Sequence, residues 1–207
     1  MADISPGQFP TTPSFVSVNF RIITPTITSE TSAGKVRRVG FGHSFYTFDV
    51  KYQNLTYNLA GIVQGFVALA QGPLLSFEIV LPEISYSDAA ASTTANSTIT
   101  SSATITAGQR YVNVNNCGAN ATVLLAGDYF RFANHSKVYM TTTDVVANSG
   151  GAANIVFSGA SVSSVPSGTR LHIQAVPFTV ILADTMQEYE VGQRGITNLS
   201  LSMREVW

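Results

Sequence analysis

The 207-residue sequence has few charged side chains. They make up 11% of it, against about 25% in an average globular protein. With a formal net charge of −1, the surface offers little repulsion between copies, which favours association. A broad nucleic-acid surface needs a stripe of Lys and Arg, whereas the only basic cluster here is Lys35, Arg37 and Arg38. We therefore expect protein partners and no specific nucleic-acid binding.

Cysteine is nearly absent as well. Because Cys117 is the only one, the chain has no intramolecular disulfide and no zinc site built from cysteines. Its setting, VNVNNCGAN, indicates a turn. A nucleophilic cysteine needs a basic or histidine-paired environment, and no neighbour in the sequence supplies one. We interpret Cys117 as a partly buried structural thiol.

Long apolar segments are also lacking. No run approaches 18 consecutive apolar residues, so we expect no membrane span. The first residues, MADISPGQFPTTPSF, lack a charged region followed by an apolar stretch, so we expect no signal peptide. Three prolines within residues 1–13 predict an extended N-terminal arm that could order on a neighbour.

Clear periodicity begins after the arm. Residues 15–27 alternate and predict a strand, with Pro25 near an edge. A second, half-buried strand is predicted where Tyr46, Phe48, Val50 and Tyr52 recur at every second position.

A helix is predicted over residues 57–71. Leu59, Ile62, Val63, Phe66, Val67 and Ala70 form one apolar face of a 3.6-residue repeat. Gly72 and Pro73 should end the helix with a left-handed turn and a missing donor. Residues 74–81, LLSFEIVL, then predict a buried strand.

The composition changes after residue 83. Arg110 is the only charged residue between Ala89 and Gly127. Short strand signals separated by turn groups are typical of a small β-barrel or β-sandwich. These signals cover residues 110–114, 122–125, 128–133, 137–146, 153–157 and 169–173. We therefore predict a mainly β fold: residues 14–83 plus 174–207 as a β-sandwich carrying the helix, and residues 84–173 as an inserted β-domain.

One stretch contains the residue types of a hydrolytic triad: Asp128, His135 and Ser136. In a hairpin with its turn at residues 134–136, Asp128 lies seven residues before His135, about 20 Å along the strand. A triad needs its three groups in mutual hydrogen-bond contact, and Ser136 lacks the glycine-flanked elbow of an exposed nucleophile. We interpret the stretch as a structural hairpin.

The remaining candidates show no catalytic or ligand spacing. His43 and His172 have no metal-ligand pattern around them, and the Gly40–Gly42 segment lacks the Lys of a phosphate loop. Glu78, Glu83 and Asp88 lie near one another in the sequence, but nothing else indicates the cleft that a catalytic carboxylate pair needs. Glu188, Glu190 and Arg194 are expected to form a solvated turn. We predict no catalytic, metal or cofactor site and no enzymatic activity.

Three stretches together resemble a known group of virion proteins. VGFGHSFYTFDVKYQNLTYNLAGIVQGFVALAQGPLLSFEIVLP (residues 39–82) is similar to the N-terminal part of distal tail and tail-tube-like proteins of tailed bacteriophages. LLAGDYFRFANHSKVYMTTTDV (residues 124–145) resembles the Gly-Asp hairpin of barrels inserted in such proteins. VPFTVILADTMQEYEVGQRGITNLSLSMREVW (residues 176–207) resembles their closing strands.

This resemblance implies a tail-tube-like β-sandwich and a structural role in the virion. Members of the group form rings, usually of six copies, that join the tail tube to hub and receptor-binding proteins. The expected location is the phage tail, with the host cytoplasm during assembly. Tail tube, tube terminator or another virion structural protein stays open as an alternative. The N-terminal arm and the loop at residues 28–40 are the candidates for reaching a neighbouring subunit.

A different class of function also stays open. A carbohydrate-binding β-sandwich usually presents exposed aromatic side chains on a shallow face, and Tyr46, Tyr52 and Tyr57 are the candidates for that role. Core packing explains two of the three more simply.

Overall fold

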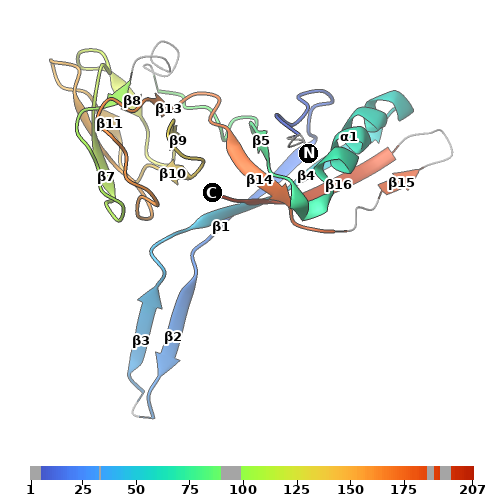
Figure 1. The fold of residues 1–207 in the computed structure, drawn as a ribbon, viewed down its shortest axis with the longest axis horizontal. Helices are drawn as coiled ribbons and strands as arrows, with labels where there is room; N and C mark the ends of the chain where they lie inside the picture. The colour runs from blue at the N-terminus through green and yellow to red at the C-terminus, as the bar shows by residue number, and fades with distance from the viewer. Residues whose placement is uncertain (1–5, 33, 90–98, 186–188, 192–196) are drawn as a thin grey trace, which may run out of the picture. The chain divides into compact units, whose positions relative to one another are not determined.

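The computed structural model describes residues 6–32, 34–89, 99–185, 189–191 and 197–207. The chain forms two compact units (Figure 1). The first comprises Met1–Ile22, Phe45–Val80 and Phe178–Trp207, and the second comprises Ile23–Ser44 and Leu81–Pro177. Residues 23–44, which the sequence placed in the first domain, therefore group with the second unit.

The predicted mainly β class with one helix is confirmed. The described residues contain one α-helix, α1 (Tyr57–Ala70), followed by a 3₁₀ turn at Gly72–Leu74. The strands are β1 (Ser17–Ile23), β2 (Thr26–Glu30), β3 (Val36–Gly40), β4 (Phe45–Leu55), β5 (Phe77–Ile79), β6 (Thr100–Ser101), β7 (Tyr111–Asn115), β8 (Thr122–Leu124), β9 (Tyr129–Phe132), β10 (Val138–Met140), β11 (Val145–Val146), β12 (Ala153–Val156), β13 (Leu171–His172), β14 (Phe178–Leu182), β15 (Tyr189–Val191) and β16 (Thr197–Glu205).

The first unit is built on one sheet in the order β1-β4-β16-β14-β5, with β15 paired to β16. The predicted alternation along β4 is confirmed, because Tyr46, Phe48, Val50 and Tyr52 are all buried. Antiparallel pairing with β16 sets Met203 opposite Phe48, so both strands turn an apolar face to the same side. The opposite face is polar and carries an ion pair between Arg21 and Asp49.

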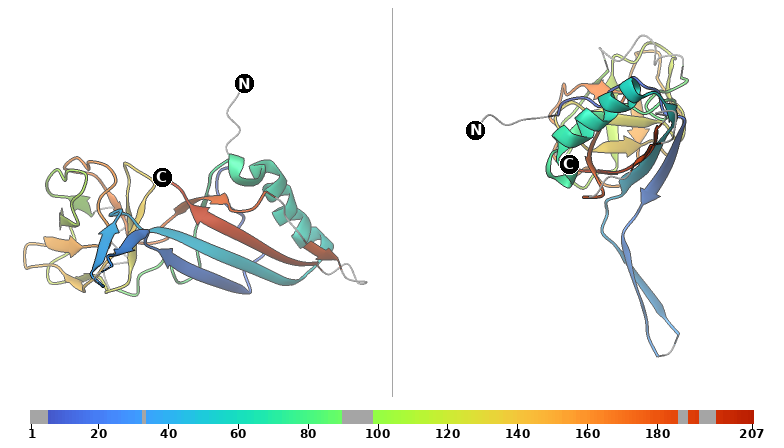
Figure 2. Two further views of the ribbon diagram at one scale, coloured as in Figure 1. Left: turned by 90° about the horizontal axis from the view of Figure 1, so that it is seen from below. Right: turned by 90° about the vertical axis from the view of Figure 1, so that its right-hand side faces the viewer.

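Helix α1 runs along one face of this sheet (Figure 2). Its predicted bounds match to within one residue. The left-handed turn begins at Gln71 (φ 53°), one residue before the expected Gly72. The helix contacts the sheet through Phe66, whose ring centroid lies 5.0 Å from that of Phe77 in β5 and 5.0 Å from that of Phe9.

We expect Phe66→Ala to lower the free energy of unfolding of the first unit by about 3 kcal/mol, because it removes a half-buried ring from this aromatic cluster. Urea unfolding followed by circular dichroism measures the change. The control is Leu69→Ala, since Leu69 is exposed on the same helix. A loss for Phe66→Ala no larger than that of the control would show that α1 packs through another face.

The described part of the N-terminal arm lies on its own chain. The Phe9 amide donates to the Glu78 carbonyl (2.7 Å), and the Glu78 amide donates to the Gly7 carbonyl (2.9 Å). The Phe9 side chain is buried. The expectation that the arm reaches a neighbour therefore does not hold for residues 6–9, because these pairings extend the free edge of β5 within the subunit. Residues 1–5 lie outside the described residues.

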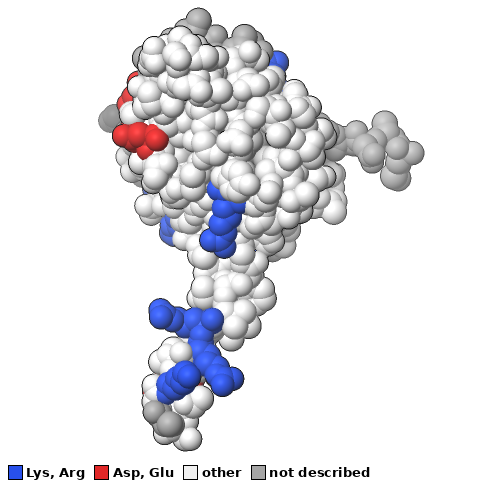
Figure 3. All heavy atoms as spheres, turned by 90° about the vertical axis from the view of Figure 1, so that its left-hand side faces the viewer, with Lys and Arg blue, Asp and Glu red and all other residues white. Residues whose placement is uncertain are grey.

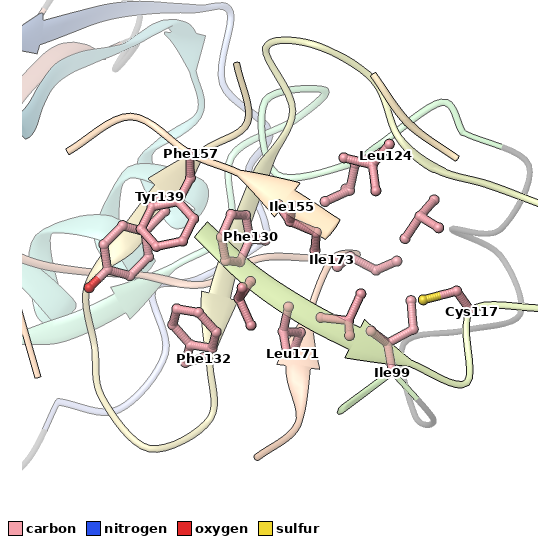
Figure 4. Close-up of a cluster of buried hydrophobic side chains, with 14 of the residues drawn as sticks. Ile99, Cys117, Leu124, Phe130, Phe132, Tyr139, Ile155, Phe157, Leu171 and Ile173 are labelled. Atoms are coloured by element: carbon pink, nitrogen blue, oxygen red, sulfur yellow. The ribbon is translucent and has the colours of Figure 1, made fainter. Parts of the chain in front are cut away.

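The second unit consists of short sheets around one apolar core. The sheets have the orders β10-β9-β13, β12-β7-β6 and β11-β8, and β2 pairs with β3. Phe130 and Phe132 from β9 pack against Tyr139 and Phe157 at the centre of this core (Figure 4). The segments through which the chain enters and leaves this core lie together, since the Val176 amide donates to the Ser85 carbonyl (2.9 Å).

Candidate assembly interface

Residues 26–40 form a β-hairpin, where the sequence suggested a loop over residues 28–40. In this β2–β3 hairpin, Ile27 pairs with Val39, Thr28 with Arg38, and Ser29 with Arg37. All ten strand residues are exposed. Strands such as β4 and β14 differ from this hairpin, because alternate side chains along them are buried.

Both faces of the β2–β3 hairpin mix apolar and basic side chains. Because directly paired residues in antiparallel strands point to the same side, Ile27, Val39 and Arg37 share one face. Arg38 and Val36 share the other. The exposed fractions of Ile27 (56%) and Val39 (63%) are large for aliphatic residues. Each face thus offers apolar area together with one guanidinium group.

The β2–β3 hairpin also has its own electrostatic character. Figure 3 shows Lys and Arg side chains gathered over its strands. Lys35, Arg37 and Arg38 stand against one carboxylate, Glu30, while the whole chain carries a net charge of −1. The rest of the chain is therefore net negative. A second copy of the chain is in this respect a complementary partner.

Physical chemistry disfavours such a hairpin in isolation. A two-stranded ribbon is at best marginally stable in water, because it buries too little apolar surface to offset the ordering of its backbone. The turn closes with the Thr31 amide donating to the Lys35 carbonyl (3.0 Å), which fixes the register but adds no core. We therefore identify the β2–β3 hairpin as the candidate assembly interface.

Strand β1 offers a second candidate surface. It stands at one end of the sheet order of the first unit and pairs with β4 on one side only, within the described residues. Ile22 and Ile23 at its end are exposed. An open strand edge presents unpaired backbone donors and acceptors to which another chain can add.

The structure does not assemble the triad-type residues into a site. The ring nitrogens of His135 contact Asn134 Oδ1 (3.0 Å) and the Tyr139 hydroxyl (2.8 Å). The Asp128 carboxylate accepts hydrogen bonds from the Ser87 hydroxyl and from the Leu125 amide. Because β9 and β10 pair as an antiparallel hairpin with Arg131 opposite Val138, the predicted hairpin is confirmed.

His135 is held in its neutral form. Burial, followed by the positive charges of Arg131 and Lys137, lowers the pKa of His135 from 6.5 to about 4. Nδ2 of Asn134 donates to the Ser164 carbonyl (2.9 Å), so the Asn134 atom facing the His135 ring is Oδ1, which can only accept. The proton of the neutral ring then lies on Nδ1 and is donated to Asn134.

This lowered pKa predicts a pH-dependent stability. The unfolded chain takes up a proton at His135 near pH 6.5, whereas the folded chain takes it up only near pH 4. Stability contributed by neutral His135 is therefore complete above pH 6.5 and is lost as the pH falls toward 4. We expect the melting temperature of the wild type to fall more steeply over this range than that of His135→Gln. Parallel melting curves for the two proteins would contradict the assignment.

The other residues singled out in the sequence, Cys117, His43 and His172, lie in different elements of the structure. Cys117 is buried, and burial raises the pKa of its thiol to about 11, so it is a thiol at neutral pH. His43 precedes β4, and its Nδ1 has no hydrogen-bond partner in the described part of the chain. His172 lies in β13. The described residues contain no group of three or more His, Cys, Asp or Glu that could hold a metal ion.

The remaining candidates are placed as follows. Glu78 lies in β5, Glu83 has a left-handed backbone (φ 62°), and Asp88 is exposed. Glu190 lies in β15, where a solvated turn was predicted, while Glu188 and Arg194 lie outside the described residues. Tyr46 and Tyr52 are buried in the first unit and cannot form a carbohydrate platform, whereas Tyr57 is 78% exposed.

Comparison with known proteins gives no family assignment. No protein-family model matches the chain, and no curated protein is similar enough to be matched. Among the residues that the structure describes, no helix is long and apolar enough to cross a membrane.

Proposed function

We propose that this chain is a structural protein of a bacteriophage tail, a ring-forming distal tail or baseplate hub component that joins the tail tube to tip proteins. It acts by docking and not by catalysis. Its partners are copies of itself, most simply six, together with the tube and the hub or receptor-binding proteins. Its location is the virion, after assembly in the host cytoplasm.

The observation that carries the proposal is the fully exposed β2–β3 hairpin. Each of its two faces combines apolar and basic side chains. If the hairpin were inserted between two neighbouring subunits, both faces would be buried at the same time. In a ring, each subunit gives such an element to one neighbour and receives one from the other, and the rotation closes after a fixed number of copies. The open edge of β1 provides a second surface for the same contact.

The resemblance of residues 39–82, 124–145 and 176–207 to tail proteins supports the assignment to a phage tail. The same geometry also supports a tail tube or tube-terminator protein, because those proteins form rings as well. Its neighbours in the phage particle determine whether the chain is a distal tail, tail tube or tube-terminator protein.

Light scattering after size-exclusion chromatography, combined with negative-stain electron micrographs, tests the proposal. We expect closed rings or stacks of rings at raised protein concentration, and we expect the protein in purified virions at the tail. A mass of one chain at every concentration, with absence from virions, would contradict the proposal.

A further inference from the structure

The second unit contains an open groove of about 530 Å³ that the assembly proposal does not use. It is formed by β7, the start of β12 and the turn before it, together with Ser102 after β6 and residues 146–147 at the end of β11. Its polar lining is four asparagines and one serine: Asn113, Asn115, Asn148, Asn154 and Ser102. No Lys, Arg, His, Asp or Glu is among the lining residues. The groove is therefore polar but uncharged.

Two of these asparagines form a fixed pair. Asn113 of β7 stands directly opposite Asn154 of β12, and Nδ2 of Asn154 donates to Oδ1 of Asn113 (2.6 Å). This bond leaves the Asn113 NH₂ group and the Asn154 carbonyl for a ligand. If both amides are turned over, the same set remains, one donor group and one acceptor. The pair thus presents a donor and an acceptor side by side.

The other amides extend this pattern. Oδ1 of Asn148 accepts from the Gly150 amide (2.9 Å) and the Ala152 amide (3.0 Å), which fixes the side chain and leaves its NH₂ group as a donor. The exposed Asn115 side chain adds a further donor and acceptor, and it has no hydrogen bond within the described part of the chain. Donors and acceptors held in place by protein bonds lower the ordering cost of binding.

Apolar surface adjoins the amides. Tyr111 and Val156 pair across β7 and β12 on the same exposed face, two residues from Asn113 and Asn154, or about 7 Å along the strands. Tyr111 is 46% exposed, and Val146 in the groove is exposed as well. An exposed aromatic ring beside fixed polar groups suits a ligand with one apolar face and a hydroxylated rim.

We propose that this groove binds a neutral saccharide. Adjacent sugar hydroxyls each donate and accept, which matches the donor and acceptor of the Asn113–Asn154 pair, and the C–H face of a pyranose matches Tyr111. The uncharged lining offers no ion pair to an anion or a cation. The Asn113 and Asn154 side chains project from the face of the sheet, whereas an added peptide strand would bind through backbone groups. The inference goes beyond the proposed tail function and does not depend on ring formation.

A glycan array with the full-length chain tests the site, followed by calorimetric titration with the best neutral oligosaccharide of glucose, galactose, mannose or N-acetylglucosamine. We expect saturable binding that weakens at least about tenfold in Tyr111→Ala, which loses the aromatic contact with the sugar face, and in the double variant Asn113→Ala/Asn154→Ala, which loses about one polar contact. Asn113→Asp is the sharper variant. It keeps an acceptor for Asn154 and replaces the NH₂ group offered to the ligand with a carboxylate oxygen, which can only accept and adds a negative charge.

Matched controls lie on helix α1, where Tyr57 and Asn58 are exposed in the other unit. Tyr57→Ala and Asn58→Ala should leave the dissociation constant unchanged. Circular dichroism shows whether each groove variant is folded, and Asn113→Asp carries the test if the alanine variants are not. The proposal is overturned by the absence of saturable binding to any neutral saccharide, by binding restricted to sialylated or sulfated glycans, or by equal affinity in the groove variants and the wild type.

Discussion

Excision of the β2–β3 hairpin is expected to abolish assembly while leaving the subunit folded. The Phe41 amide donates to the Pro25 carbonyl (3.3 Å), so the two ends are adjacent and a short Gly-Ser-Gly link can replace residues 26–40. No buried strand residue is removed. Because the shortened subunit lacks the surface that contacts its neighbour, it should stay monomeric. Light scattering should then report the mass of one chain under conditions where the wild type forms rings.

Point variants separate charge from shape in this contact. Arg37→Glu/Arg38→Glu places like charge against a net-negative partner and should weaken assembly strongly at low salt, with partial recovery at high salt as the repulsion is screened. Arg110→Glu is the control, because Arg110 is exposed in the second unit and lies outside the hairpin. Rings of unchanged size from the excised protein would show that the hairpin is not the assembly element.

Phe130→Ala is expected to cost about 3–5 kcal/mol of unfolding free energy, the usual range for a phenylalanine removed from a sealed core. Phe130 is fully buried, and the rings of Phe132, Tyr139 and Phe157 lie 5.4, 5.7 and 5.5 Å from it, centroid to centroid. The loss is a large share of a typical domain stability of about 5–15 kcal/mol, so the second unit should unfold at a clearly lower temperature than in the wild type.

Hydrogen exchange localises this effect. Amides of β9 and β10 should lose protection, whereas those of β4 and β16 in the first unit should keep it. Phe130→Leu, which retains most of the volume, should cost about 1 kcal/mol, and Leu125→Ala at a partly exposed position about 1 kcal/mol or less. Equal exchange rates in wild type and Phe130→Ala would mean that this ring is not central to the core.

The sequence allowed the elements with a buried face to be predicted well. Tyr46, Phe48 and Val50 alternate because one side of β4 packs against the core, and the helical spacing around Phe66 exists because α1 covers that core. The strand signal at residues 128–133 and the turn predicted at residues 134–136 correspond to β9 and the turn that follows it, since Phe130 and Phe132 are buried on one face of β9. In each case burial imposes a period that is visible in the residue order.

Strands without a buried face show no such period in the residue order, so they cannot be predicted from it. Residues 26–30 and 36–40 carry polar and apolar side chains on both sides, so the sequence predicts a loop over residues 28–40 where the structure has most of the β2–β3 hairpin. The strand predicted over residues 15–27 ends at Ile23, and β2 begins only after Pro25, which cannot donate to a sheet. The predicted strand at 137–146 is two short strands, β10 and β11.

The groove could not be predicted because its parts are distant in the sequence. Asn113 and Asn154 are 41 residues apart and become neighbours only through the register of β7 and β12. Asparagine is also frequent around them, so neither residue stood out. The tyrosines that the sequence suggests for carbohydrate binding lie in the first unit. Tyr111 lies in β7, which matches the strand predicted over residues 110–114, but nothing in the sequence indicates a binding role for it.

The hydrogen bond between Val176 and Ser85 has an evolutionary consequence. A segment whose two ends meet can be exchanged for another of any length without altering the distance that the host sheet must bridge. Residues 86–175 could therefore be grafted onto a different scaffold, or traded for a foreign module, while β5 and β14 keep their pairing. Diversification of one half of this molecule would then proceed without disturbing the geometry of the other.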